Sequence, residues 1–311
     1  MNILVTGGAG FIGRWTVKKL LSDGHRVTVL DDLSNGRLMN IEEFRNNSDF
    51  RFIEGDIKER EALGRIFAGG FDLVYHLAAS INVQDSIDDP RTTYDNDVSG
   101  TFNVLEECRR QGIKMLFMSS CMVYERSLDK AGIREMHPVK PASPYAASKL
   151  AGEALTLSYY YAYGLPTVVV RPFNTYGPFQ KSSGEGGVVA IFIQRDLQGE
   201  DLLIYGDGVQ TRDLLYVEDC ADFVVAAGRD RRADGQLLNA GLGEDVSINE
   251  LAYMICKDKN RIRHVPHIHP QSEIQKLLCN YDKAKMLLDW EPRVSLEEGI
   301  ARTREWIAAG S

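Results

Sequence analysis

The sequence lacks the patterns that mark several large protein classes. Its five cysteines include no C-x-x-C pair, so neither a zinc site nor a disulfide scaffold is indicated, and a reducing cytoplasm is expected. No apolar run approaches the length of about 18 residues that a membrane span needs. A strand-like segment beginning at Asn2 leaves no room for a signal peptide.

Basic residues are also fewer than acidic residues. The 311 residues contain 36 Lys and Arg against 44 Asp and Glu, a formal net charge of −8. A protein that binds the phosphate backbone of a nucleic acid needs a basic surface, so that class of partner is disfavoured. Hydrophobic residues make up 44% and charged residues 26%, which is ordinary for a globular protein of one large or two closely joined domains.

Short apolar runs alternate with helical patterns through the first half of the chain. Continuous apolar strands separated by helices are typical of a parallel sheet covered on both faces, so we predict an α/β, doubly wound Rossmann fold. The predicted strands are 3–5, 27–30, 50–53, 73–76, 114–118 and 167–170, and the predicted helices are 11–21, 98–108 and 146–163.

The pattern changes after residue 171. Gly, Ser and Pro cluster in 176–187, which predicts a mobile loop over a ligand, and mixed elements follow. The strands expected there are near 202–204 and 237–240, and the helices near 247–256, 281–288 and 296–308. We therefore expect a dinucleotide-binding domain over 1–171, completed by parts of 214–241, and an interleaved, smaller mixed α/β substrate lobe over 172–311.

A glycine-rich turn follows the first predicted strand and opens the first helix. Gly7, Gly10 and Gly13 permit a tight turn, close approach of a pyrophosphate and close helix packing, and the helix N-terminus favours anions. Asp31 lies 18 positions after Gly13, at the end of the second strand, where a carboxylate accepts hydrogen bonds from a ribose 2′-hydroxyl and repels a 2′-phosphate. This combination predicts binding of NAD rather than NADP.

A tyrosine and a lysine lie four positions apart at the start of the helix that begins near residue 146. The spacing places Tyr145 and Lys149 on one helical face, where an ammonium and a positive nicotinamide ring would favour the phenolate. Ser120 follows the fifth strand, at the edge where a doubly wound sheet presents residues to its crevice. A catalytic Ser120, Tyr145 and Lys149 set is predicted, with Tyr145 as the base.

Together these residues resemble the extended short-chain dehydrogenase/reductase family, in particular its NAD-dependent nucleotide-sugar epimerase/dehydratase branch and the UDP-hexose 4-epimerases within it. The resemblance extends over nearly the whole chain. Its further motifs are Asp56-Ile57, Leu77-Ala78-Ala79, Asn96, the RPFNTYGP run at 171–178, GDG at 206–208 with Arg212-Asp213, WEP at 290–292 and LEEG at 296–299.

The resemblance implies which residues bind the two ligands, NAD and a nucleotide sugar, most simply a UDP-sugar. The implied cofactor residues are Gly7, Gly10, Phe11, Ile12, Gly13, Asp31, Asp32, Asn35, Gly36, Asp56, Ile57, Leu77, Ala78, Ala79, Asn96, Tyr145, Lys149 and Phe173. The implied substrate residues are Ser120, Tyr145, Asn174, Val188, Tyr205 and Arg212. It also implies a homodimer formed through the helices over 98–108 and 146–163.

Two departures from the family's pattern bear on the reaction. Val-Tyr-Glu stands at 123–125 where these epimerases carry Val-Tyr-Gly, and the stretch 269–276 lacks the usual diphosphate-binding Arg, for which Lys276 could substitute. The 4,6-dehydratases carry an acidic pair after the active-site Ser or Thr, whereas this chain has Cys121 and Met122. Epimerisation at C4 is therefore favoured, and a Cys121-assisted dehydration or C5 epimerisation is the alternative.

Two further interpretations are disfavoured by the residues. A non-catalytic dinucleotide sensor would be free to lose the Tyr or the Lys, and this chain keeps both. His264, His267 and His269 lie within six positions, but no carboxylate pattern completes a metal site and prolines stiffen the segment, so no metal is expected.

Overall fold

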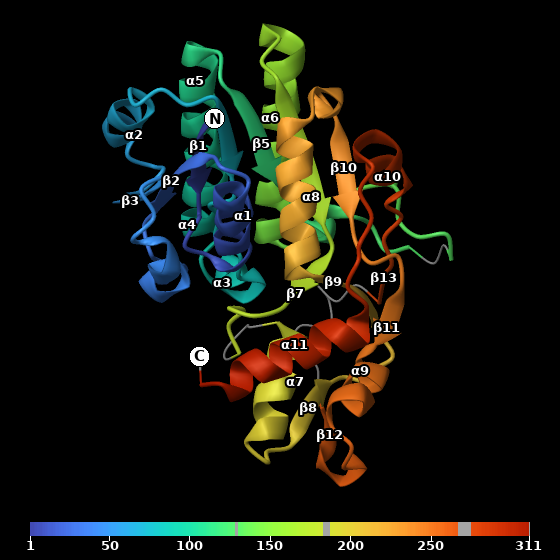
Figure 1. Cartoon of the computed structure of the whole chain (residues 1–311). Coiled ribbons are helices and arrows are strands. Elements are labelled where there is room, and N and C mark those ends of the chain that lie inside the picture. Colours follow the sequence, from blue (N-terminus) through green and yellow to red (C-terminus); the bar gives the residue numbers. More distant parts are fainter. Residues whose placement is uncertain (128–129, 183–186, 267–274, 311) are drawn as a thin grey trace.

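The computed structural model describes residues 1–127, 130–182, 187–266 and 275–310, and shows two lobes (Figure 1). The upper lobe is built on a seven-stranded sheet in which every neighbouring pair is parallel. In order across the sheet, the strands are β10 (Leu237–Ala240), β6 (Thr167–Pro172), β5 (Lys114–Met118), β4 (Leu73–His76), β1 (Asn2–Thr6), β2 (Arg26–Asp31) and β3 (Phe50–Glu54). The predicted doubly wound fold is confirmed.

Helices cover both faces of this sheet because its strands bury side chains on both sides. One face is covered by α1 (Phe11–Ser22) and α8 (Val217–Arg229), which pack against each other. The other face is covered by α2 (Arg60–Phe67), α5 (Thr101–Gln111) and α6 (Pro144–Tyr163), with α3 (Val83–Asp88) and α4 (Pro90–Tyr94) beside α6. A π-helical turn, Asp95–Gly100, leads into α5.

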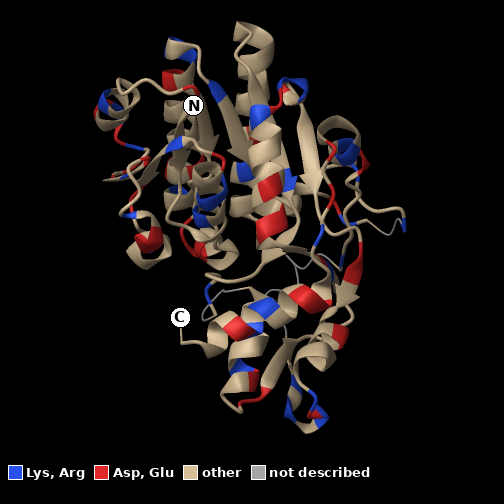
Figure 2. Cartoon of the chain, viewed as in Figure 1, with Lys and Arg blue, Asp and Glu red and all other residues tan. Residues whose placement is uncertain are grey.

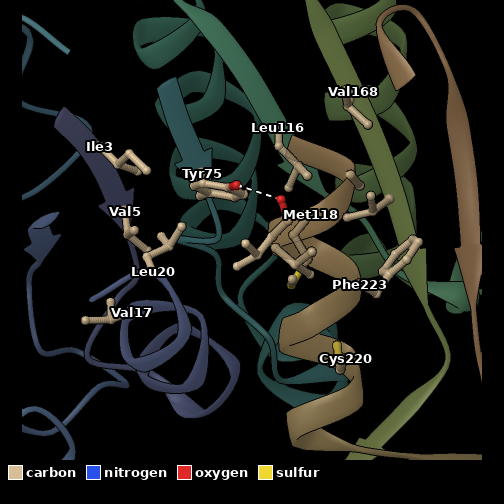
Figure 3. Packing of buried hydrophobic residues seen from close by; sticks show 14 of the residues in the cluster. Ile3, Val5, Val17, Leu20, Tyr75, Leu116, Met118, Val168, Cys220 and Phe223 are labelled. Carbon is tan, nitrogen blue, oxygen red and sulfur yellow. Dashed lines mark hydrogen bonds between the residues drawn. The ribbon is translucent and has the colours of Figure 1, made fainter. Parts of the chain in front are cut away.

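Alternate residues along a strand point to opposite faces of the sheet and pack into two different hydrophobic cores. Ile3 and Val5 pack with α1 and α8, whereas Leu4, between them, packs with α2 and α5. Figure 3 shows the first of these cores, where the Tyr75 hydroxyl donates a hydrogen bond to the Val225 carbonyl oxygen at 3.0 Å. Both faces of the sheet are thus apolar, as the continuous hydrophobic strands predict.

The lower lobe contains two small sheets and three main helices. The four-stranded sheet consists of β7 (Asn174–Tyr176), β9 (Thr211–Tyr216), β11 (Asp245–Ser247) and β13 (Lys276–Leu277). The other pairs β8 (Leu202–Tyr205) with β12 (Ile262–Val265). Around them lie α7 (Val188–Leu197), α9 (Ile248–Ile255) and α11 (Leu296–Ala308), while α10 (Asp282–Leu288) lies beside β10 of the upper lobe.

The chain crosses between the lobes more than once. It leaves the main sheet after β6, returns with α8 and β10, and crosses again before α11 (Figure 1). Charged residues of both signs lie on the helices and loops of both lobes, and the inner strands carry few of them (Figure 2). Among the described residues, no helix combines the length and apolar character needed to cross a membrane.

Candidate active site

A cleft opens at the carboxyl ends of β1, β2 and β4, where the family resemblance places the dinucleotide. Most of the predicted cofactor residues line it: Gly7, Gly10, Phe11, Ile12, Gly13, Asp31, Asp32, Asn35, Gly36, Ile57, Leu77, Ala78, Ala79 and Asn96. Asp56, Tyr145, Lys149 and Phe173 are not part of this lining. The lining also includes Leu30, Ser34, Gly55, Ile81 and Met118, which the sequence did not single out.

The glycine turn between β1 and α1 leaves no room for side chains. Gly7 has φ of +72°, and a Cβ there would lie 2.6 Å from the backbone nitrogen of Ala78. The first residue of α1 is Phe11, and its N-cap, Gly10, has no side chain to satisfy the free N–H groups of the first turn. An anionic pyrophosphate fits this position because it supplies the acceptors that those groups lack.

The carboxylate of Asp31 is held at the end of β2 by two backbone donors. The N–H groups of Ala9 and Leu33 each donate to it at 2.9 Å, so the carboxylate is tied to the glycine turn. Burial raises the pKa of Asp31, and the two hydrogen bonds oppose that rise. The Asp31 carboxylate is therefore held in a fixed position at the wall of the cleft, where it can accept a hydrogen bond from a ribose hydroxyl.

The opposite wall of the cleft follows β4 and is attached to β1. The Leu77 N–H donates to the Thr6 carbonyl oxygen at 3.1 Å, and the Ala78 N–H donates to the Thr6 hydroxyl oxygen at 3.3 Å. His76 bridges Thr6 (2.7 Å) and Thr101 (2.9 Å), and burial lowers its pKa to about 3. A neutral His76 thus fixes the wall to both the turn and α5.

Ser120, Tyr145 and Lys149 come together at the carboxyl end of β5. Helix α6 begins at Pro144, and its N-cap Ser143 accepts a hydrogen bond from the Ala146 N–H, which sets Tyr145 in the first turn. The Ser120 side chain acts on Tyr145 as a hydrogen-bonding neighbour that lowers the pKa of the tyrosine, and the Ser120 hydroxyl oxygen accepts a hydrogen bond from the Met122 N–H at 3.2 Å. Lys149 Nζ donates to the carbonyl oxygen of Met118 at 3.0 Å and lies 6.0 Å from the centre of the Tyr145 ring.

Burial governs the protonation of both groups. It raises the pKa of Tyr145, an effect that the hydrogen bond from Ser120 opposes, and it lowers the pKa of Lys149. The carboxylate of Asp97 favours the Lys149 ammonium. Asp97 is 2% exposed and accepts hydrogen bonds from the Ser80 N–H at 2.6 Å and the Ser148 hydroxyl at 3.0 Å. No motif in the sequence singles out this buried carboxylate beside α6.

The thiol of Cys121 is closed off from solvent. Its residue is 2% exposed and packs with Val123, Tyr124 and Phe173, and burial raises its pKa to about 12. A neutral, buried thiol is a poor proton acceptor near neutral pH. The geometry therefore gives little support to the Cys121-assisted alternative.

The predicted substrate residues divide into two groups. Asn174 on β7 and Arg212 on β9 lie on paired strands, where Asn174 is opposite Leu214, and the charge of Arg212 opposes the rise in the pKa of Cys121. Asn174 Oδ1 is buried without a hydrogen-bond partner among the described residues, which leaves an acceptor for a ligand. By contrast, Val188 is the first residue of helix α7. Tyr205 is the last residue of β8, a strand of the separate two-stranded sheet.

Lys276, the possible replacement for the missing diphosphate contact, lies next to this sheet position. It is paired with Thr211 in β-sheet register, one residue from Arg212, and its ammonium forms an ion pair with Asp245 at 3.6 Å. His267 and His269 lie outside the described residues, as do 269–274 of the stretch noted above. Within the described residues no group of His, Cys, Asp and Glu is arranged to hold a metal.

Comparison with known proteins agrees with this geometry. Residues 3–241 match the NAD dependent epimerase/dehydratase family. The chain belongs to this family. A UDP-glucose 4-epimerase of Mycolicibacterium smegmatis is 39% identical over 310 residues, covering 98% of both chains. The chain is therefore an NAD-dependent enzyme of the nucleotide-sugar epimerase/dehydratase class.

Several solved structures share the whole fold of this chain. The X-ray structure of Pal from Bacillus thuringiensis is 62% identical, with a TM-score of 0.98 over 100% of both chains. A UDP-glucose 4-epimerase of Thermotoga maritima, solved with UDP-glucose, is 35% identical, with a TM-score of 0.92 over 99% of both chains. The family's reactions differ, since UDP-sugar decarboxylases and a dTDP-glucose 4,6-dehydratase solved with NAD also match.

Proposed function

We propose that the chain is an NAD-dependent 4-epimerase that acts on a UDP-hexose through a transient 4-keto sugar. The observation that carries the proposal is the grouping of Ser120, Tyr145 and Lys149 at the carboxyl end of β5, where the Lys149 ammonium lies 6.0 Å from the centre of the Tyr145 ring. The carbonyl that accepts the hydrogen bond from Lys149 belongs to Met118, which lines the dinucleotide cleft. Proton transfer and cofactor binding are thus assigned to adjoining positions.

The chain's own residues supply the proton chemistry of this reaction. Tyr145 removes the proton of the sugar 4-hydroxyl, and Ser120 holds that oxygen and the tyrosine oxygen in line. The ammonium of Lys149 favours the ionised tyrosine because opposite charges attract most strongly in a buried site. NAD, held by the glycine turn, Asp31 and the wall at 77–79, supplies a hydride acceptor and donor at C4 when it is bound.

The lower lobe holds the nucleotide diphosphate in this proposal. The planar guanidinium of Arg212 can pair with two phosphate oxygens, and Asn174 offers its unpartnered buried oxygen to a donor on the substrate. This anchors the nucleotide while the keto sugar turns over between hydride removal and return. Val188 and Tyr205 are expected to contact the substrate only from the outer part of the lobe.

The experiment is an analysis of products by mass and NMR. Purified enzyme is incubated separately with UDP-glucose, UDP-galactose and UDP-N-acetylglucosamine, and Tyr145→Phe is the inactive control. An isomer of unchanged mass, differing at C4, supports the proposal. A product lighter by one water would instead assign a dehydratase, and turnover by Tyr145→Phe at the wild-type rate would contradict the role of Tyr145.

We also propose a homodimer that acts in the cytoplasm. Helices α5 and α6 pack together, and aromatic side chains stand exposed on them: Phe102 is 42% exposed and Tyr161 75%. A two-fold arrangement would bury these side chains in a four-helix interface. Light scattering coupled to gel filtration should give a dimer mass for the wild type, and Phe102→Asp should shift it toward the monomer. A monomeric wild type would contradict the proposal.

A further inference from the structure

Residues 177–181 of the lower lobe lie against helix α1 of the upper lobe. They directly follow strand β7. The indole N–H of Trp15, on α1, donates to the Pro178 carbonyl oxygen at 3.1 Å. This hydrogen bond joins positions that lie 163 residues apart in the sequence. It fixes residues 177–181, which we call the crossing segment, on helix α1.

The aromatic ring of Phe179 reinforces this attachment. The Arg14 guanidinium lies 3.8 Å from the centre of the ring, Trp15 meets it edge-on at 6.1 Å, and Trp306 of α11 lies 4.8 Å away. Arg14 and Trp15 are buried and Phe179 and Trp306 are half-buried, and cation–π and aromatic contacts of this kind each add to the attachment. Phe179 adopts this place with φ of +72°, a conformation that a non-glycine residue keeps only when its surroundings hold it.

The attachment brings Lys181 to the cofactor cleft. Its ammonium donates a hydrogen bond to Oδ1 of Asn35, which lines the cleft beside Asp31 and Asp32. An ammonium has donors only, so it must meet the carbonyl end of the amide. The NH₂ end of Asn35 is therefore left to donate to a ligand.

The charge of Lys181 matters because the cleft is otherwise acidic. Its lining contains Asp31 and Asp32, and no Lys, Arg or His occurs among the described residues that line it. A dinucleotide brings two negative phosphates into that lining. Lys58 also reaches a lining asparagine, Asn96, at 3.3 Å, but it is ion-paired with Asp56 at 3.0 Å.

We propose that Lys181 is a positioning residue that retains the dinucleotide, acting from the lower lobe through Asn35. The proposal deepens the cofactor-binding part of the function proposed above. An epimerase that returns the hydride to the same sugar needs a cofactor that stays bound through the cycle. Strand β7 carries Asn174, a proposed substrate residue, and leads directly into the crossing segment. Retention of the dinucleotide by Lys181 is therefore linked, along the chain, to the strand that is proposed to bind the substrate.

The test measures release of NAD in the absence of any sugar. Each protein is loaded with NAD, freed of excess by rapid desalting, and mixed with alcohol dehydrogenase and ethanol, which convert released NAD to NADH read at 340 nm. The variants are Lys181→Ala and Lys181→Arg. Lys18→Ala is the control for charge, since Lys18 is an exposed lysine on α1 whose ammonium lies 4.8 Å from the Trp15 ring.

Lys181→Ala is expected to release NAD about three- to tenfold faster than wild type, the effect of one exposed, charge-assisted hydrogen bond. Lys181→Arg should restore most of the retention, Lys18→Ala should stay within about twofold of wild type, and added salt should narrow the difference. Release from Lys181→Ala at the wild-type rate, or equal acceleration by Lys18→Ala, would overturn the proposal. Because no sugar is present, the result is independent of which reaction the product analysis assigns.

Discussion

Replacing Gly13 by alanine should disrupt the junction between the glycine turn and α1. An added Cβ would lie 2.1 Å from the Gly7 carbonyl oxygen and 2.8 Å from the Gly8 Cα, both backbone atoms. Ordinary contact begins near 3.4 Å, so turn and helix would have to separate by 3.4 − 2.1 = 1.3 Å. Since no rotamer change relieves a clash with backbone, the overpacking cost should reach or exceed about 1–3 kcal/mol.

A matched substitution, Gly64→Ala, is expected to raise the stability of the protein instead of lowering it. Gly64 lies within α2 and has nothing within 4 Å of an added Cβ, so Gly64→Ala should stabilise the protein by about 0.5–1 kcal/mol through helix propensity. Thermal melting of both variants, with and without NAD, measures the contrast. Gly13→Ala should melt lower and lose the rise in melting temperature that NAD gives wild type, whereas Gly64→Ala should keep that rise. Equal melting and equal response to NAD would refute the close approach described for Gly13.

Further predictions concern the catalytic and cofactor residues. Tyr145→Phe should abolish turnover and leave NAD bound, since only the phenolic oxygen is lost; substantial remaining activity would exclude Tyr145 as the base. Lys149→Met should weaken both turnover and cofactor retention in the same assays. Asp31→Ala should bring the Kd values for NAD and NADP closer together, whereas a wild type that binds both equally would contradict the role given to Asp31. Cys121→Ala should keep most of the turnover, because burial raises the pKa of this thiol to about 12.

Elements whose signals are local in the sequence could be predicted. The first six strands of the main sheet are apolar runs bounded by polar residues or glycine, and each is found within two residues of its predicted bounds. The glycine turn and Asp31 lie within one strand–helix–strand unit, so sequence spacing places them together. Ser120 and Tyr145 both lie in the connection between β5 and β6, one at the end of β5 and the other in the first turn of α6, so the crossover topology brings them to the same edge of the sheet.

Elements that depend on tertiary contacts were missed. Helix α8 begins directly after β9 and has no side-chain N-cap, and nine of its thirteen residues are buried, so its polar stripe of Glu218, Asp222 and Arg229 is narrow and its pattern is easily missed. Strand β13 has only two residues and exists through pairing with β9. The loop predicted over 176–187 starts at the last residue of β7 and includes the crossing segment anchored on α1, while 183–186 lie outside the described residues.

The choice among the family's reactions depends on what lies directly after Ser120. Loss of water across C5 and C6 needs one group to remove a proton from carbon and another to protonate the departing hydroxyl. Met122 has no titratable group, and the neighbouring Cys121 is buried among apolar side chains that favour its neutral thiol. Burial also raises the pKa of Tyr145, but Tyr145 has the Lys149 ammonium 6.0 Å from the centre of its ring, and a phenol beside an ammonium is suited to exchange a single proton with an oxygen. A site so equipped favours removal and return of hydrogen at one carbon over elimination between two.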